Sequence, residues 1–241
     1  MTRPYLSKDL TAIVLAAGNG DRMKSQTPKP LHKVCGKEML NMILDAIELS
    51  GIESSITIVP LDHQLFKISV GDRTRFEVQK QAKGTGHALL QAKNSAKKSS
   101  YILVLNGDIP LITPETILRL TSLHQEKGST VTFLTTRRNN PSGSGRVRRT
   151  PDGVVEAIVE ECDADSEIKH ITEVNCGVYC FKSPWVWSAL ESLKPSSTNE
   201  FYLTDLIALA LIQNLGVETL ETTQEEEVIN VNDRIQLAEA E

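Results

Sequence analysis

Short runs rich in apolar residues alternate with stretches of helical periodicity over the first 136 residues. The apolar runs are typical of buried strands, and they predict strands at residues 10–18, 54–60, 75–79, 101–108 and 129–136. Apolar residues spaced three and four apart, with Gly stops, predict helices at residues 38–51, 61–70, 84–97 and 113–128. Such an alternation builds a mostly parallel sheet covered by helices on both faces, so we expect an α/β, Rossmann-like fold.

The pattern changes after residue 136. Residues 137–153 are rich in Gly, Pro and Arg and predict loop and hairpin, while residues 154–164 and 173–181 predict strands. Further predictions are helices at 183–193 and 199–214, edge strands at 216–222 and 225–231, and a helix over 232–241. We expect one domain over residues 1–241, with a first part at 8–136 and a smaller antiparallel lobe at 137–230.

Composition and charge narrow the class of protein. Hydrophobic residues make up 40% and charged residues 24% of the chain, which suits a soluble globular domain. No apolar run approaches the ~18 residues that a membrane span needs, and the N-terminus has no signal-peptide pattern. We therefore expect a cytoplasmic protein without a membrane partner. The net charge of -5 argues against general nucleic-acid binding.

The four cysteines form no CxxC motif, and no His stands at a zinc-finger spacing from them. We expect four reduced thiols, mostly buried, and no zinc site. One stretch differs from the acidic whole: between Gly18 and Glu38 there are five cations and two anions. A basic stretch in an acidic protein favours a small anionic ligand over a polyanion.

The string LAAGNGDRM follows the first predicted strand. Gly18 and Gly20 are expected to adopt positive φ and to expose backbone N–H groups that hold phosphate, with Arg22 and Lys29 adding positive charge. The string is neither GxGxxG nor a Walker loop. Taken alone, it also fits an ordinary tight turn between a strand and a helix.

Two more polar strings follow predicted strands. In QAKGTGHA, the turn at Gly84 and Thr85 can bind a planar base, and Gln79 or Gln81 can read its edge. The alternative is a plain turn in which Thr85 caps the helix. In LNGDIPLI, Asp108 is placed at a strand end to hold Mg²⁺ beside phosphates, and the alternative is an Asx-turn.

A fourth set of polar residues is spread along the second part of the chain: Gly145, Glu160, Asn175 and Asn232. Each also has an ordinary explanation, such as an exposed strand residue for Glu160 and a helix cap for Asn232. Because the carboxyl ends of parallel strands meet at one edge, we expect the polar strings of the first part to lie together there.

Taken together, these strings resemble the sugar-1-phosphate nucleotidylyltransferases, in particular the N-terminal uridylyltransferase domain of bacterial bifunctional N-acetylglucosamine-1-phosphate uridylyltransferase/acetyltransferases. The resemblance covers nearly the whole chain and keeps the family's order of motifs. The matching strings are LAAGNGDRMKSQTPKPLHKVCGKEML, QAKGTGHAL, LNGDIPLI, GSGRV, IVEECDA, EVNCGVY, NEFYLTDLI and VNDRIQLAEAE. It implies the nucleotide-diphospho-sugar transferase fold and a reaction of UTP with N-acetylglucosamine-1-phosphate that gives UDP-N-acetylglucosamine and pyrophosphate.

The resemblance also implies roles for the matching positions. Arg22 and Lys29 would be catalytic, and Asp108 and Asn232 would hold the cofactor Mg²⁺. The implied sugar-binding residues are Asn106, Gly145, Glu160 and Asn175. The implied nucleotide-binding residues are Leu15, Ala16, Ala17, Gly18, Gly20, Gln79, Gly84 and Thr85. The hexapeptide repeats of the family's acetyltransferase domain do not occur in the sequence, so no acetyl transfer is expected, and the oligomeric state stays open.

Three positions depart from the family pattern. Asp21 stands where Thr or Ser is usual, Asn106 stands where Tyr is frequent, and Cys176 replaces a Thr. Asn106 and Cys176 are expected near the sugar, which keeps open a nucleotidylyltransferase for another sugar phosphate or nucleotide. Asp21 keeps open a catalytically weak nucleotide-binding relative.

Asp21 has two physical explanations. A carboxylate ~8 Å from a phosphate, at an effective dielectric of ~20, costs about 2 kcal/mol, or roughly 30-fold in affinity. Alternatively, Asp21 caps the free N–H groups at a helix start. The two explanations predict opposite effects when Asp21 is replaced.

Overall fold

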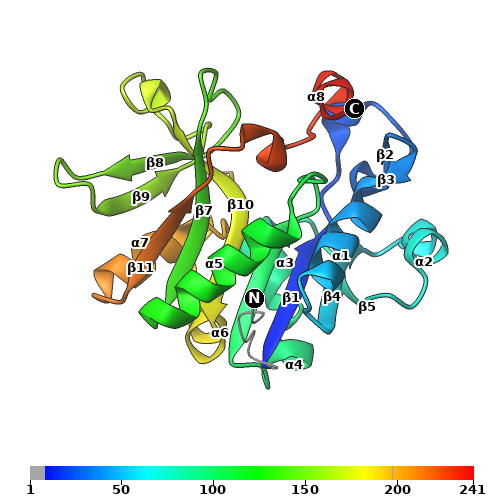
Figure 1. Cartoon of the computed structure of the whole chain (residues 1–241), viewed down its shortest axis with the longest axis horizontal. Helices are drawn as coiled ribbons and strands as arrows, with labels where there is room; N and C mark the ends of the chain where they lie inside the picture. Colours follow the sequence, from blue (N-terminus) through cyan, green and yellow to red (C-terminus); the bar gives the residue numbers. More distant parts are fainter. Residues whose placement is uncertain (1–8, 197) are drawn as a thin grey trace.

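A computed structural model describes residues 9–196 and 198–241 of the chain. Its centre is a nine-stranded sheet in which seven strands follow the order β11-β7-β10-β6-β1-β4-β5 (Figure 1). Their bounds are Val217–Glu221 (β11), Val131–Arg137 (β7), Glu173–Lys182 (β10), Tyr101–Asn106 (β6), Leu10–Leu15 (β1), Ser54–Pro60 (β4) and Arg75–Gln79 (β5). β10 runs antiparallel to both β6 and β7, and the other pairings along this path are parallel.

The five strands predicted for the first part are β1, β4, β5, β6 and β7, which confirms the mostly parallel α/β fold. β6 shows why its residues form a central strand. Residues 102–105 are fully buried and alternate between the two faces of the sheet. Leu103 and Leu105 join the core on one face, whereas Ile102 and Val104 join the core on the other.

Helices cover both faces of the sheet. One face packs against α1 (Met39–Leu49), α2 (Gln64–Val70) and α5 (Pro114–Lys127). The other packs against α3 (Thr85–Leu90), α4 (Lys93–Ala96), α6 (Ser183–Ser192) and α7 (Asp205–Ile212). In α5 the predicted start and stop residues act as expected. Thr113 Oγ1 accepts from the N–H of Thr116 at 3.2 Å, Pro114 opens the helix, and Gly128 ends it at φ 59°.

The second part of the chain returns to the same sheet. β10 inserts between β6 and β7, and β11 pairs with β7 at the edge. The hairpin of β8 (Arg146–Arg149) and β9 (Val155–Val159) lies off this seven-strand path and forms an antiparallel lobe, joined through the pairing of β8 with β10 (Figure 1). Both parts of the chain therefore share one framework.

Two element predictions in the second part are wrong. Residues 225–231 are not a strand, because Glu225–Val228 form a 3-10 turn in which the Glu227 carboxylate accepts hydrogen bonds from the Thr113 and Thr116 hydroxyls. The helix predicted from residue 199 begins only at Asp205. Ahead of it, Phe201 donates its N–H to Lys83 O at 2.9 Å and accepts from the Gly86 N–H at 2.8 Å. These long-range bonds replace the helical ones.

The C-terminal helix α8 (Arg234–Ala240) lies beside the short hairpin of β2 (Lys33–Val34) and β3 (Lys37–Glu38) (Figure 1). Asp233 caps it by accepting the N–H groups of Ile235 and Gln236 at 2.9 Å. Two further 3-10 turns complete the described chain, Lys29–Leu31 and Ile168–His170, besides that at Asp21–Met23.

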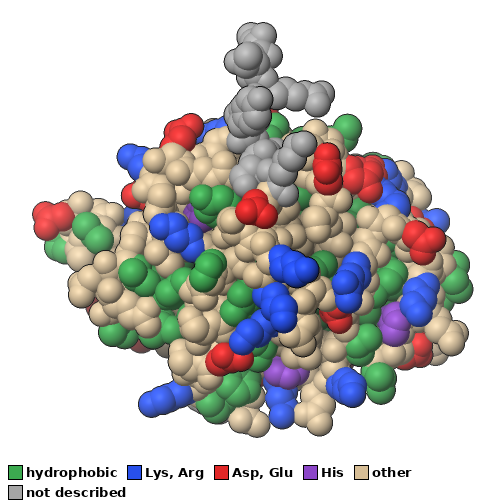
Figure 2. All heavy atoms as spheres, turned by 90° about the horizontal axis from the view of Figure 1, so that it is seen from below, with side chains coloured by type: hydrophobic (Ala, Val, Ile, Leu, Met, Phe, Trp, Pro, Cys, Tyr) green, Lys and Arg blue, Asp and Glu red, His purple; other side chains and the backbone are tan. Residues whose placement is uncertain are grey.

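The four cysteines are free, as expected. Cys176 and Cys180 are buried, but Cys35 and Cys162 are exposed, so the expectation of mostly buried thiols is wrong for half of them. On the face seen in Figure 2, acidic and basic side chains are interspersed with hydrophobic ones. None of the helices within residues 9–196 and 198–241 is long and apolar enough to cross a membrane.

Candidate functional site

A cleft opens at the carboxyl ends of the parallel strands, where the polar strings of the first part meet. It has a larger half of about 500 Å³ and a smaller half of about 360 Å³. The two halves are continuous, because they share lining residues: Arg22, Thr85, Asn106, Asp108, Glu200, Tyr202 and Asn232. A single cleft thus presents two adjoining compartments.

The loop after β1 forms one wall of the larger half. Gly20 has φ +67°, and a Cβ built on it would lie 2.9 Å from Cβ of Lys29, so this position requires glycine. Gly18 does not adopt positive φ, which corrects the expectation for that residue. A Cβ on Gly18 would meet nothing within 4 Å, so its backbone faces open space in the cleft.

Asp21 is exposed and lines the larger half. It opens the 3-10 turn Asp21–Met23, whose N-cap is Gly20, and no side chain makes a cap hydrogen bond there. The interpretation of Asp21 as a helix cap is therefore wrong. Its exposed carboxylate therefore lies where it would repel an anion bound in the cleft.

Lys29 joins residues that are far apart in the sequence. Its Nζ lies 2.6 Å from Asp108 Oδ2 and 3.1 Å from Asn232 Oδ1, and the Arg22 guanidinium donates to the same Asn232 oxygen at 3.0 Å. The Val231 N–H donates to the Asp108 carbonyl at 2.8 Å, which holds the segment before Asn232 against the end of β6. The structure thus brings together Arg22, Lys29, Asp108 and Asn232, the four residues predicted as catalytic or metal-binding.

The donor set at this end suits a hard cation. Asp108 supplies a carboxylate and Asn232 an amide oxygen, and oxygen ligands of this kind bind Mg²⁺ together with substrate phosphates. Asp108 Oδ1 also accepts from Asn230 Nδ2 at 3.3 Å, so its bonds reach distant residues instead of closing an Asx-turn. Within the described ranges, no group of three or more His, Cys, Asp and Glu side chains is placed to hold a metal.

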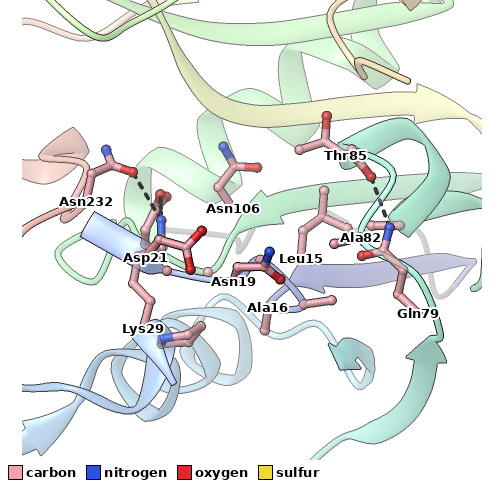
Figure 3. A pocket seen from close by; sticks show the side chains of 18 of the residues that line it. Leu15, Ala16, Asn19, Asp21, Lys29, Gln79, Ala82, Thr85, Asn106 and Asn232 are labelled. Carbon is pink, nitrogen blue, oxygen red and sulfur yellow. Dashed lines mark hydrogen bonds and ion pairs between the residues drawn. The ribbon is translucent and has the colours of Figure 1, made fainter. Parts of the chain in front are cut away.

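Gln79, Ala82 and Thr85 lie at the opposite end of the larger half from Lys29 and Asn232 (Figure 3). The Gln79 amide nitrogen donates to Gly84 O at 3.1 Å and lies 2.9 Å from His87 Nδ1. Gln81 is exposed and does not line the cleft, which leaves Gln79 as the glutamine that does.

The turn at Gly84 is fixed by the loop before α7. Gly84 has φ +89°, and a Cβ on it would lie 2.6 Å from the carbonyl oxygen of Phe201. Thr85 is the first residue of α3, and its Oγ1 accepts from the N–H of Leu203 at 2.9 Å. The alternative in which Thr85 caps its own helix is therefore wrong: its hydroxyl docks the neighbouring loop.

All four predicted sugar-binding residues line the smaller half: Asn106, Gly145, Glu160 and Asn175. Glu160 Oε1 accepts from the Thr204 hydroxyl at 2.8 Å, and burial, the largest cause, raises the pKa of this carboxyl. β10 bulges between Asn175 and Tyr179, where Asn175 Oδ1 accepts from the N–H of Gly177 at 3.2 Å. The bulge places the Asn175 side chain at the cleft.

The two departures expected beside the sugar have different positions. Asn106 packs on Gly177, which has φ +75° and has no room for a side chain, since a Cβ would lie 2.2 Å from Asn106 Nδ2. Cys176 lines neither half of the cleft itself, although its neighbours Asn175 and Gly177 both line the smaller half. It is fully buried, and burial raises the pKa of its thiol to about 12.

Several lining residues were not singled out from the sequence. Glu200 and Tyr202 line both halves, and Ala82 and Thr204 line one half each. Glu200, Tyr202 and Thr204 fall within the string NEFYLTDLI, for which the sequence predicts a helix. The polar residues ahead of its apolar run were the available signal that a loop precedes the helix.

Comparisons with known proteins agree with this architecture. The sequence model of the family described as nucleotidyl transferase matches residues 11–224. A protein of Alkaliphilus oremlandii named bifunctional protein GlmU is 43% identical over 233 residues, which are 96% of this chain and 51% of that protein. The protein of the same name from Clostridioides difficile is 42% identical over 231 residues, 95% of this chain and 50% of that protein. The chain thus spans about half the length of these relatives.

A solved structure shows the same fold at lower identity. It is that of a protein assigned as a glucose-1-phosphate thymidylyltransferase from Bacillus anthracis, in complex with sucrose. It superposes with a TM-score of 0.82 at 20% identity, covering 96% of this chain and 93% of that one.

Proposed function

Because the chain belongs to the nucleotidyl transferase family, we propose that it is a uridylyltransferase that forms UDP-N-acetylglucosamine and pyrophosphate from UTP and N-acetylglucosamine-1-phosphate. The observation that carries the proposal is the division of one cleft into two halves that meet at Asp108 and Asn232. Two substrates that exchange a nucleotidyl group need such adjoining compartments.

The larger half suits the nucleotide. The exposed backbone of the loop at Gly18 and the cations Arg22 and Lys29 provide the donors and positive charge that a triphosphate needs. At the far end, the Gln79 amide nitrogen is engaged by Gly84 and His87, so its amide oxygen is left to accept a hydrogen bond. The N3–H of uracil is a donor that matches this acceptor.

The smaller half suits the sugar. Glu160 and Asn175 offer a carboxylate and an amide to hydroxyl and amide groups, and Gly145 keeps the wall beside them free of a side chain. Asn106 lies at the boundary of the two halves. A sugar phosphate bound in this half would direct its phosphate toward Arg22, the cation that both halves share.

The mechanism needs no general base. An ionised phosphate oxygen of the sugar phosphate attacks the α-phosphorus of UTP in line, a new P–O bond forms, and the bond from the α-phosphorus to the bridging oxygen breaks. Pyrophosphate leaves with that oxygen. Lys29 and Arg22 offset the negative charge of the phosphates and hold them in position, which is the main catalytic requirement of such transfers.

Asp108 and Asn232 are the residues that would hold Mg²⁺. Bound there, Mg²⁺ would supply positive charge that offsets the charge of the phosphate oxygens.

The test is a panel of nucleoside triphosphates and sugar 1-phosphates assayed for pyrophosphate release with Mg²⁺. We expect UTP with N-acetylglucosamine-1-phosphate to give the highest kcat/KM. A different best pair would favour a nucleotidylyltransferase for another sugar or base, as the position of Asn106 allows. UTP binding without turnover of any pair would favour a nucleotide-binding relative weakened at Asp21.

A further inference from the structure

The smaller half of the cleft is bounded by a turn at residues 143–145, which leads into β8. Gly143, Ser144 and Gly145 all line the cleft. An ion pair between the buried Arg146 and the half-exposed Glu161 holds this turn: Glu161 Oε2 accepts from the N–H of Gly143 at 3.0 Å and from Arg146 Nη1 at 2.7 Å. The same Arg146 nitrogen donates to the carbonyl of Ser144. One carboxylate and one guanidinium thus hold consecutive residues of the turn.

Arg146 is a charged side chain in the interior of the protein. It is only 1% exposed, and its Nε has no hydrogen-bond partner within the described part of the chain. A buried guanidinium is costly unless a carboxylate pairs with it, and Glu161 provides that pair. The Gly143 N–H and Arg146 also lower the pKa of the Glu161 carboxyl, which keeps it ionised at neutral pH.

Glu160 and Glu161 are adjacent in the sequence but have different contacts. Glu160 lines the cleft, whereas Glu161 bonds to the turn. A Cβ built on Gly145 would lie 3.4 Å from Glu160 Oε2 and 3.0 Å from Cγ2 of Ile158. The turn therefore already approaches Glu160 closely, and a displacement of the turn would change the shape of this half.

We propose that Arg146 and Glu161 are positioning residues: their ion pair fixes the 143–145 turn against Glu160 and so sets the affinity for the sugar phosphate without touching it. The inference rests on the proposed function, because it requires that the smaller half bind the sugar. Neither Arg146 nor Glu161 lines the cleft, so their role in substrate affinity would be indirect.

The test compares Glu161→Gln and Arg146→Lys with wild type in the pyrophosphate-release assay. We expect the KM for the sugar phosphate to rise about tenfold or more, because a small shift of a binding group lowers affinity steeply. We expect kcat and the KM for UTP to stay within about twofold, since the triphosphate loop lies in the other half. Calorimetric titration with UTP alone checks that nucleotide affinity is unchanged.

The matched control is a second ion pair on the same hairpin. Arg148 Nε lies 3.3 Å from Glu156 Oε2, and both side chains are well exposed, at 47% and 41%. Glu156→Gln and Arg148→Lys remove or alter a pair of the same chemistry that does not line the cleft, so neither KM is expected to change.

The outcomes are distinguishable. An unchanged sugar-phosphate KM in Glu161→Gln overturns the inference. A lower kcat and melting temperature together with a rise in both KM values also overturns it, because such a change would mark a purely structural ion pair. If Arg146→Lys does not fold, Glu161→Gln alone tests the inference. This variant is expected to fold, because position 161 is half-exposed and glutamine has nearly the same shape as glutamate. A wild type that binds UTP but turns over no sugar phosphate refutes the proposed function and the inference with it.

Discussion

Lys29 Nζ lies 2.6 Å from Asp108 Oδ2, and both side chains are largely buried, at 17% and 11% exposure. The two residues come from different segments: Lys29 opens the 3-10 turn after the β1 loop, and Asp108 follows β6. Their ion pair connects the wall that suits the triphosphate to the strand end that suits a divalent cation. We therefore expect turnover to depend strongly on charge at this junction.

Asp108→Asn is expected to lower kcat by at least about 100-fold, because it removes the carboxylate from the junction and leaves Lys29 without a partner of opposite charge. The steady-state rate of pyrophosphate release measures this loss. The control is Asp62→Asn at an exposed position away from the cleft, which should leave kcat unchanged. A rate near wild type in Asp108→Asn, with normal thermal stability, would remove Asp108 from the reaction.

Asp21→Thr is expected to raise the affinity for UTP. The carboxylate lines the triphosphate half without a capping role, but its exposure lets water and salt screen it. The gain should therefore be about three- to tenfold, below the roughly 30-fold that a dielectric of ~20 gives. Isothermal titration calorimetry with UTP measures it.

Asp21→Asn keeps the shape and removes the charge, so it should give a similar gain in UTP affinity, and both gains should shrink at high salt. Unchanged or weaker binding in both variants would show that Asp21 does not repel the triphosphate.

Glu160→Gln is expected to raise the KM for the sugar phosphate about tenfold with little change in the KM for UTP, since it weakens a charge-assisted hydrogen-bond acceptor in the smaller half. Burial raises the pKa of Glu160, so the charged form is lost at a higher pH than for an ordinary glutamate. The wild-type sugar-phosphate KM should accordingly rise as the pH falls through this raised pKa, and the variant should lack that dependence. Equal pH profiles for the two proteins would contradict the assignment.

His124 is expected to make the fold sensitive to acid. It is fully buried, with Nδ1 2.9 Å from the Thr132 hydroxyl, and burial lowers its pKa to about 4. Between pH 6.5 and pH 4 the unfolded chain binds more protons at this residue than the folded one, so stability falls as the pH is lowered through this window. The loss is on the order of 3 kcal/mol.

Urea unfolding as a function of pH measures this contribution. His124→Gln should flatten the acid limb of the stability profile, whereas His170→Gln, at an exposed position, should leave it unchanged. An acid limb of wild-type slope in His124→Gln would show that other groups cause it.

The sequence predicted the parallel half of the fold and the edge of the sheet at which the polar strings meet, because both follow from short-range patterns. The apolar runs of β1 and β6 end in polar strings, and neighbouring parallel strands end at the same edge. Gly18 and Asp108 therefore had to lie close in space. Successive side chains of a strand point to opposite faces, which is why Cys176 in β10 faces away from Asn175 and the cleft.

Other features depend on contacts between distant segments. Residues 199–204 line the cleft as a loop because Phe201 bonds to Lys83 and Gly86, which no local propensity encodes. Residues 225–228 turn instead of forming an edge strand because Glu227 is held by the hydroxyls of Thr113 and Thr116. Thr85 bonds to a neighbouring loop instead of capping its own helix for the same reason, since its partner Leu203 is 118 positions away.

The most direct measurement of the central claim uses UTP labelled with ³²P at the α-phosphate, with N-acetylglucosamine-1-phosphate and Mg²⁺. We predict that the label appears in UDP-N-acetylglucosamine, in a one-to-one ratio with unlabelled pyrophosphate, and that Asp108→Asn suppresses both products. Label in pyrophosphate, or no labelled nucleotide sugar from wild type, would contradict it.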